Sequence, residues 1–109
     1  MLAPFSSSNL TDVHDLPAGG TVEGTGLSIQ WQNGPLGTGD ERKEPNGAFV
    51  ETVIAAAKQR IEWYQEVNGG KFACDENYFA INYLKLALRK LDDRTKDRQS
   101  RGVEGTHQE

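Results

Sequence analysis

A stripe of mostly apolar residues recurs every three or four positions in the last third of the chain, and it constrains the fold more than any other feature. Its members are Asn77, Ala80, Ile81, Leu84, Ala87, Leu88 and Leu91. This spacing places them on one face of an α-helix, close to a seven-residue repeat over about two heptads. The sequence therefore predicts a helix over residues 75–101, with Asp75 as a candidate N-cap and Gly102 as the stop.

A second helical stripe precedes the first and predicts a helix over residues 45–68. Its members are Val50, Val53, Ile54, Ala57, Ile61 and Tyr64. Pro45 and Asn46 introduce this helix, with Asn46 or Gly47 near the cap, and residues 68–70 end it. Because the connection to the next helix is short, we expect the two helices to form an antiparallel hairpin.

The region before the helices shows the two-residue period of β-structure. Leu27, Ile29 and Trp31 alternate with polar residues, and residues 21–23 could supply a partner strand. Residues 21–44 are therefore predicted to form a β-hairpin followed by a Gly- and Pro-rich loop. Because a two-stranded hairpin is marginally stable alone, we expect its apolar face to cover the helical part.

The ends of the chain carry no sustained period. Residues 1–20 are rich in Ser, Asp, Pro and Gly, and we expect a flexible N-terminal arm that contributes little to the core. Residues 102–109 are predicted to be a non-helical tail. The predicted fold class is α+β, with residues 21–109 forming a single domain in which a small antiparallel β element precedes the helical hairpin.

The composition indicates a small core. The chain has 109 residues and a mean hydropathy of -0.66, so oligomerisation would help it to bury apolar surface. No apolar run is long enough to span a membrane, and residues 1–10 do not resemble a signal peptide. We therefore expect a cytoplasmic protein that has no membrane partner.

Neither metal binding nor catalysis has support in the sequence. Cys74 is the only cysteine, and His14 and His107 lie near opposite ends, so there is no disulfide framework and no zinc-ligand spacing. Acidic pairs such as Glu62 and Glu66 have no nucleophile or base placed beside them, which favours a solvated face. We expect no metal, no cofactor and no enzymatic activity.

The charge distribution is more informative than the net charge of -4. Residues 89–101 hold six cations against three anions in an otherwise acidic chain. The overall charge argues against a long nucleic acid as partner, whereas the local cluster fits a small phosphorylated ligand. An equally acceptable interpretation is that these cations only complement the dipole at the C-terminus of the helix.

Three polar residues fall on or near the apolar stripe of the second helix. Arg94 and Arg98 continue its line, and Asn77 lies at its start, where it either caps the helix or faces a ligand or partner chain. Asn77 and Arg94 are 17 residues apart, which on a straight helix means roughly 25 Å and about 100° of rotation. One chain therefore cannot bring both to one small ligand, but two chains paired antiparallel could.

The aromatic residues divide by their expected location. Those on the predicted helices are expected in the core or an interface: Trp63, Tyr64, Tyr78, Phe79 and Tyr83. Trp31 leads into a loop and Phe72 lies between the helices, so these two are the candidates for stacking on a ligand base.

Several short motifs within residues 31–106 resemble a known family. They are Trp31, Asn33 to Pro35, Pro45 to Ala48, Cys74, Glu76, Asn77, the basic cluster from Arg94 to Arg101, and Gly102 to Thr106. Together they look like small phage proteins of the Thoeris anti-defence sponge family, whose helical hairpin is similar to that of phage anti-CBASS sponges.

The resemblance implies an oligomeric protein, a homodimer or a larger assembly such as a hexamer. It implies binding of a cyclic ADP-ribose isomer, an immune signal that the protein hides without cleaving; related proteins also sequester cyclic oligonucleotides. Carried over by position, the ligand-binding residues would be Asn77 and Arg94 first, then Phe72, Trp31 and Arg98. The alternative is a helical-hairpin interaction module that binds a host or phage protein.

Overall fold

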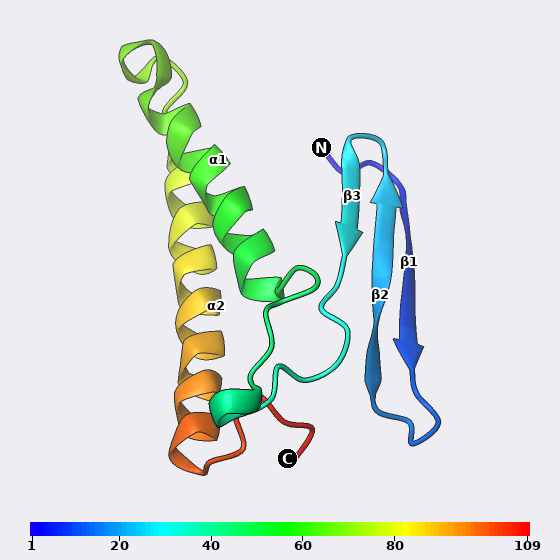
Figure 1. Cartoon of the computed structure of the whole chain (residues 1–109). Coiled ribbons are helices and arrows are strands. Elements are labelled where there is room, and N and C mark those ends of the chain that lie inside the picture. Colours follow the sequence, from blue (N-terminus) through cyan, green and yellow to red (C-terminus); the bar gives the residue numbers. More distant parts are fainter. The chain divides into compact units, whose positions relative to one another are not determined.

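The computed structural model describes all 109 residues and has three strands followed by two long helices (Figure 1). The strands are β1 (Phe5–Thr11), β2 (Pro17–Gly24) and β3 (Leu27–Gln30); a short 3-10 helix (Gly39–Glu41) precedes α1 (Val50–Gly70) and α2 (Asp75–Ser100). The predicted α+β class is confirmed. The chain divides into two compact units, residues 1–49 with 99–109 and residues 50–98. That residues 21–109 form a single domain stays a prediction.

The sheet is antiparallel in the order β1-β2-β3 and contains the predicted hairpin. Val22 pairs with Ile29, and Gly24 pairs with Leu27 across the Thr25–Gly26 turn. Gly26 has a φ of +70°, a left-handed conformation that glycine adopts without steric cost. Val22 is 8% exposed and is the most buried apolar side chain of the sheet.

The predicted flexible arm over residues 1–20 is wrong, because β1 and the first part of β2 lie there. Phe5 pairs with Gly24, and Ser7 pairs with Val22. Every side chain of β1 is exposed, so its sequence carries no alternation that would reveal a strand. The strand is defined by its backbone pairing with β2. Gly20 of β2 permits this close pairing, because a Cβ added there would clash with the Ser8 carbonyl oxygen.

Helix α1 begins at Val50, five residues later than predicted. The residues before it are extended instead: Ala48 donates its N–H to the Gln30 carbonyl at 2.8 Å and accepts from the Gln32 N–H at 3.0 Å. Asn46, a predicted cap, accepts the Asn33 N–H at 2.8 Å and donates to the Asn33 carbonyl at 2.9 Å. These bonds hold the segment beside the end of β3 and delay the helix.

The C-terminal tail is tied to the loop that follows the sheet. Arg42 donates to both carboxylate oxygens of Glu104, at 2.6 and 3.0 Å, and the Gly37 N–H donates to the Gly105 carbonyl at 2.8 Å. The hydrogen bond from Arg42 to Glu104 raises the pKa of Arg42. Gly102, with a φ of +73°, follows the last helical turn as predicted.

The burial of α2 follows the predicted stripe. Every member of that stripe is half-buried or buried, and Ile81 is 9% exposed. The rest of the helix surface carries large exposed side chains: Tyr78, Phe79, Tyr83 and Leu86. No helix of the structure combines the length and apolarity needed to cross a membrane.

Candidate ligand pocket at the hairpin turn

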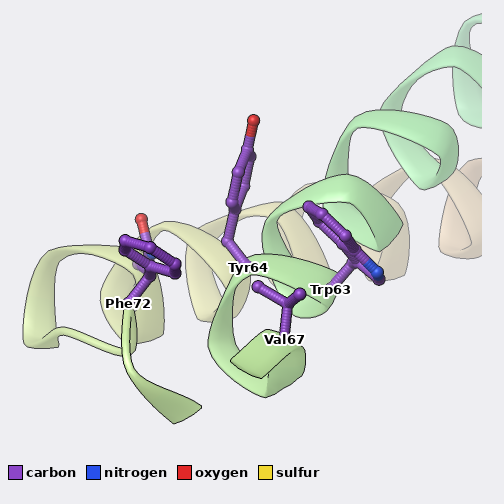
Figure 2. Close-up of a pocket in the computed structure, with 5 residues that line it drawn as sticks. Trp63, Tyr64, Val67 and Phe72 are labelled. Atoms are coloured by element: carbon purple, nitrogen blue, oxygen red, sulfur yellow. The ribbon is translucent and has the colours of Figure 1, made fainter. Parts of the chain in front are cut away.

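A pocket of about 400 Å³ lies where α1 turns into α2. It is lined by Trp63, Tyr64 and Val67 of α1, Phe72 of the connection and Asn77 of the first turn of α2 (Figure 2). This volume is within the range of small-molecule sites, which are typically apolar with a few polar groups. Two of the predicted ligand-binding residues, Phe72 and Asn77, therefore meet in one pocket.

The turn is built by left-handed residues and by one glutamine side chain. Asn68 and Gly69 have φ values of +54° and +64°, which end the helical path of α1 at the predicted place. The Gln65 side chain then holds the backbone of Cys74, accepting its N–H at 3.0 Å and donating to its carbonyl at 3.2 Å. This clasp fixes the start of α2 against the last turn of α1, which positions Phe72 and Asn77.

Three aromatic rings of the pocket are accessible. Trp63 is 40% exposed, Tyr64 42% and Phe72 55%. Trp63 and Tyr64 meet edge to face, with ring centroids 5.3 Å apart. Half-exposed rings of this kind can stack on a planar ligand, and the half-buried Asn77 amide offers both a donor and an acceptor.

The charges of the pocket lie on its rim, because none of the five lining residues is ionisable except the Tyr64 phenol. The Arg60 guanidinium carbon is 4.4 Å from the Trp63 ring centroid and 5.0 Å from that of Tyr64. Lys71 Nζ is 5.7 Å from the Phe72 ring centroid. All three distances are typical of cation–π contacts.

Helix α1 also carries an ion pair, in which Lys58 Nζ lies 2.8 Å from a carboxylate oxygen of Glu62. The hydrogen bond from Lys58 lowers the pKa of Glu62, so this carboxylate is ionised at neutral pH. Its charge is matched within the helix by a partner one turn away.

The two predicted arginines lie at the other end of α2. Asn77 and Arg94 share one continuous helix, so their separation along it is roughly 25 Å. Arg94 is exposed, whereas Arg98 is half-buried in the last turn. No single pocket of this chain therefore holds both Asn77 and Arg94.

The expectation that Arg94 continues the apolar stripe is wrong. Thr95 takes the covered position after Leu91, and its hydroxyl donates to the Leu91 carbonyl at 3.2 Å. The next covered residue after Leu91 is therefore four positions later, at Thr95, whereas the sequence interpretation placed it three positions later, at Arg94. Arg94 is consequently exposed at the edge of the covered side.

Trp31, the remaining predicted residue, belongs to the other compact unit. It forms a bridge with Ala48, donates its N–H to the Gly20 carbonyl at 2.9 Å and is half-buried. It is not among the lining residues of the pocket.

Trp63, Tyr64, Val67 and Arg60 are the pocket and rim residues that the sequence interpretation missed. The five helical aromatics were expected in a core or an interface; within this chain they are 40–68% exposed, so the core interpretation is wrong. A usable signal was present, because Arg60 precedes Trp63 and Tyr64 by three and four residues, just before the helix-ending Asn68.

The fold and the pocket define a small α+β protein with an aromatic site at the tip of a helical hairpin. No family model matches the chain. Over 81 residues, however, it is 37% identical to the protein "Thoeris anti-defense 1" of Bacillus phage SBSphiJ7. The match covers 74% of this chain and 52% of that protein, so the chain spans about half the length of this relative. This similarity confirms the predicted resemblance to Thoeris anti-defence proteins over the matched residues. The sponge activity that the resemblance implies stays a proposal.

Proposed function

We propose that this chain is a phage anti-defence protein that binds and sequesters a cyclic nucleotide immune signal without cleaving it. The signal would be a cyclic ADP-ribose isomer or a cyclic oligonucleotide, and its removal would block Thoeris-type immunity. The observation that carries the proposal is the pocket that joins Phe72 and Asn77 to two further aromatic rings. The relationship to a protein named for Thoeris anti-defence supports the biological role.

The proposed site divides the ligand between side chains of two kinds. Aromatic rings bind the faces of a base through stacking, and the Asn77 amide binds its polar edge. Arg94 and Arg98 would complete the contacts, with their guanidinium groups bonding phosphate in a bidentate manner. That Trp31 stacks on a ligand stays a prediction.

The site requires a second copy of the chain. An antiparallel, two-fold pairing of α2 helices would bring Asn77 of one copy beside Arg94 of the other and create two equivalent sites. A homodimer is the smallest assembly that satisfies this geometry, and a hexamer could be built from such dimers.

A sequestering protein needs affinity rather than turnover. To outcompete a receptor it needs a nanomolar dissociation constant, about -12 kcal/mol of binding free energy. The pocket offers stacking and hydrogen bonding, and its lining holds no carboxylate, histidine or thiol that could act as a base or nucleophile.

Titration calorimetry with a purified cyclic ADP-ribose isomer tests the binding step. We expect a nanomolar dissociation constant and one ligand per chain, because a two-fold dimer has two sites. Equilibrium dialysis of the same mixture guards against a binding reaction with little heat. Absence of binding at micromolar ligand in both measurements contradicts the proposal.

A second candidate function is supported by the exposed face of α2. Tyr78, Phe79, Tyr83 and Leu86 are 49–68% exposed, and such a surface is typical of protein interfaces. If the hairpin is instead an interaction module, pull-down from infected lysate would recover a stoichiometric host or phage protein. The purified protein would then show no excess absorbance near 260 nm, whereas a sequestering protein carries bound nucleotide.

A further inference from the structure

Two cations contact the aromatic rings of the pocket. Arg60 lies over Trp63 and Tyr64, and Lys71 lies over Phe72. Both cations are exposed, so their donors are open to solvent. Lys58, the other cation of this part of α1, is instead paired with Glu62 at 2.8 Å.

The contact with a ring leaves the binding capacity of Arg60 intact. A guanidinium group uses its face for a cation–π contact, while its N–H donors lie in its plane and point outward. The rings hold the group in place, which reduces the side-chain entropy lost when it binds an anion. A planar donor fork held beside stacking rings suits a ligand that carries phosphate next to an aromatic base.

We propose that Arg60 and Lys71 form a cationic rim that binds the phosphates of the ligand and makes the pocket selective for nucleotides over uncharged nucleosides. This inference rests on the proposed function, because it adds contacts from the pocket's own copy to the phosphates that Arg94 and Arg98 of the second copy would also bind. Arg60 carries the larger share, since it contacts two rings and can bond phosphate with two parallel hydrogen bonds. Lys71 acts as a point charge beside Phe72.

The test compares Arg60→Gln, Arg60→Lys and Lys71→Gln in full-length protein, with a cyclic ADP-ribose isomer as the probe at low and high salt. Lys43→Gln, at an exposed lysine outside both the pocket and the basic cluster of residues 89–101, is the control. We expect Arg60→Gln to weaken binding roughly 10- to 150-fold at low salt, because hydrogen bonds to charged groups are worth that factor. The difference in affinity between Arg60→Gln and the unchanged protein should be smaller at high salt, because salt screens the attraction between Arg60 and the phosphates.

Arg60→Lys should fall between the unchanged protein and Arg60→Gln, and Lys71→Gln should weaken binding less than Arg60→Gln. Binding within twofold of the unchanged protein for Arg60→Gln overturns the proposal. An equal loss at every salt concentration also overturns it, because that pattern indicates a structural role in supporting Trp63. If the unchanged protein binds no probe, the proposed function itself fails, which is a distinct result.

Discussion

Phe72 is the pocket residue whose role is simplest to test, because its ring is exposed on a short connection between two helices. Its exposure of 55% means that its ring contributes little to the stability of the chain. Asn77 differs, since it is half-buried at the start of the covered stripe of α2 and has its amide at the pocket. At the scale of single residues, a flat apolar surface and one oriented amide are the elements of base recognition.

Replacing Phe72 with alanine should weaken binding of a cyclic ADP-ribose isomer roughly 5- to 150-fold, because stacking on one aromatic ring is worth about 1–3 kcal/mol. Calorimetry measures the change, and circular dichroism should show unchanged helix content. Phe5→Ala is the matched control, since Phe5 is a comparably exposed phenylalanine on β1. A loss of affinity of equal size in both variants would contradict the assignment.

Arg94→Ala should abolish or weaken binding by at least about tenfold while leaving the fold and the assembly intact, because an exposed arginine supports no core contact and a charge-assisted hydrogen bond is worth about 1.5–3 kcal/mol. Calorimetry and size-exclusion chromatography together check both parts. Lys85→Ala, at an exposed cation of the same helix outside the basic cluster, provides the comparison. Normal affinity in Arg94→Ala would remove this residue from the site.

At the scale of elements, the hairpin and the β2–β3 pair follow from periodicity, and their boundaries depend on contacts that periodicity does not encode. The stripe of α2 is predicted over its whole length because seven positions agree on one face. The start of α1 is not, because Asn46 and Ala48 make hydrogen bonds with distant residues. Strand β1 is likewise invisible in a polar sequence, since only its backbone is used. Part of the pocket could be predicted from the sequence, because a residue between two helices such as Phe72 is exposed to solvent. The exposure of aromatic rings on a helix, such as Trp63, could not be predicted, because it depends on where the helix ends.

The Gln65 clasp is the element-scale contact that orders the turn. Gln65→Ala removes two hydrogen bonds to Cys74 and should destabilise the chain by about 1–2 kcal/mol. Urea unfolding followed by helix signal measures this change. Gln59→Ala, an exposed glutamine of α1, should change stability by no more than a few tenths of a kcal/mol. Equal stability of both variants and the unchanged protein would show that the clasp is not stabilising.

At the scale of the whole molecule, the chain buries very little apolar surface by itself. Val22 and Ile81 are the only buried hydrophobic residues, while five aromatic residues of the hairpin helices and Phe72 remain accessible. A small chain with such a surface gains stability by association. The roughly 25 Å between Asn77 and Arg94 would give the proposed assembly a functional role, because a second copy would complete the proposed site.

Tyr83 tests this assembly, since it is 68% exposed on α2 and does not line the pocket. Tyr83→Glu should reduce the assembly to smaller species in analytical ultracentrifugation, because a charge at an apolar interface costs free energy on association. Nucleotide affinity should fall in parallel. Tyr83→Phe should behave as the unchanged protein. A monomeric unchanged protein that still binds nucleotide would contradict the two-copy site.

The central claim is that the protein binds a cyclic nucleotide signal and keeps it intact. The direct measurement is to incubate the purified protein with a stoichiometric amount of a cyclic ADP-ribose isomer, remove free ligand, denature the complex by heat and analyse the released nucleotide by chromatography. We expect the nucleotide to be absent from the free fraction before heating and to be recovered chemically unchanged afterwards. Recovery of a linear or hydrolysed product, or retention of no nucleotide at all, would contradict the account.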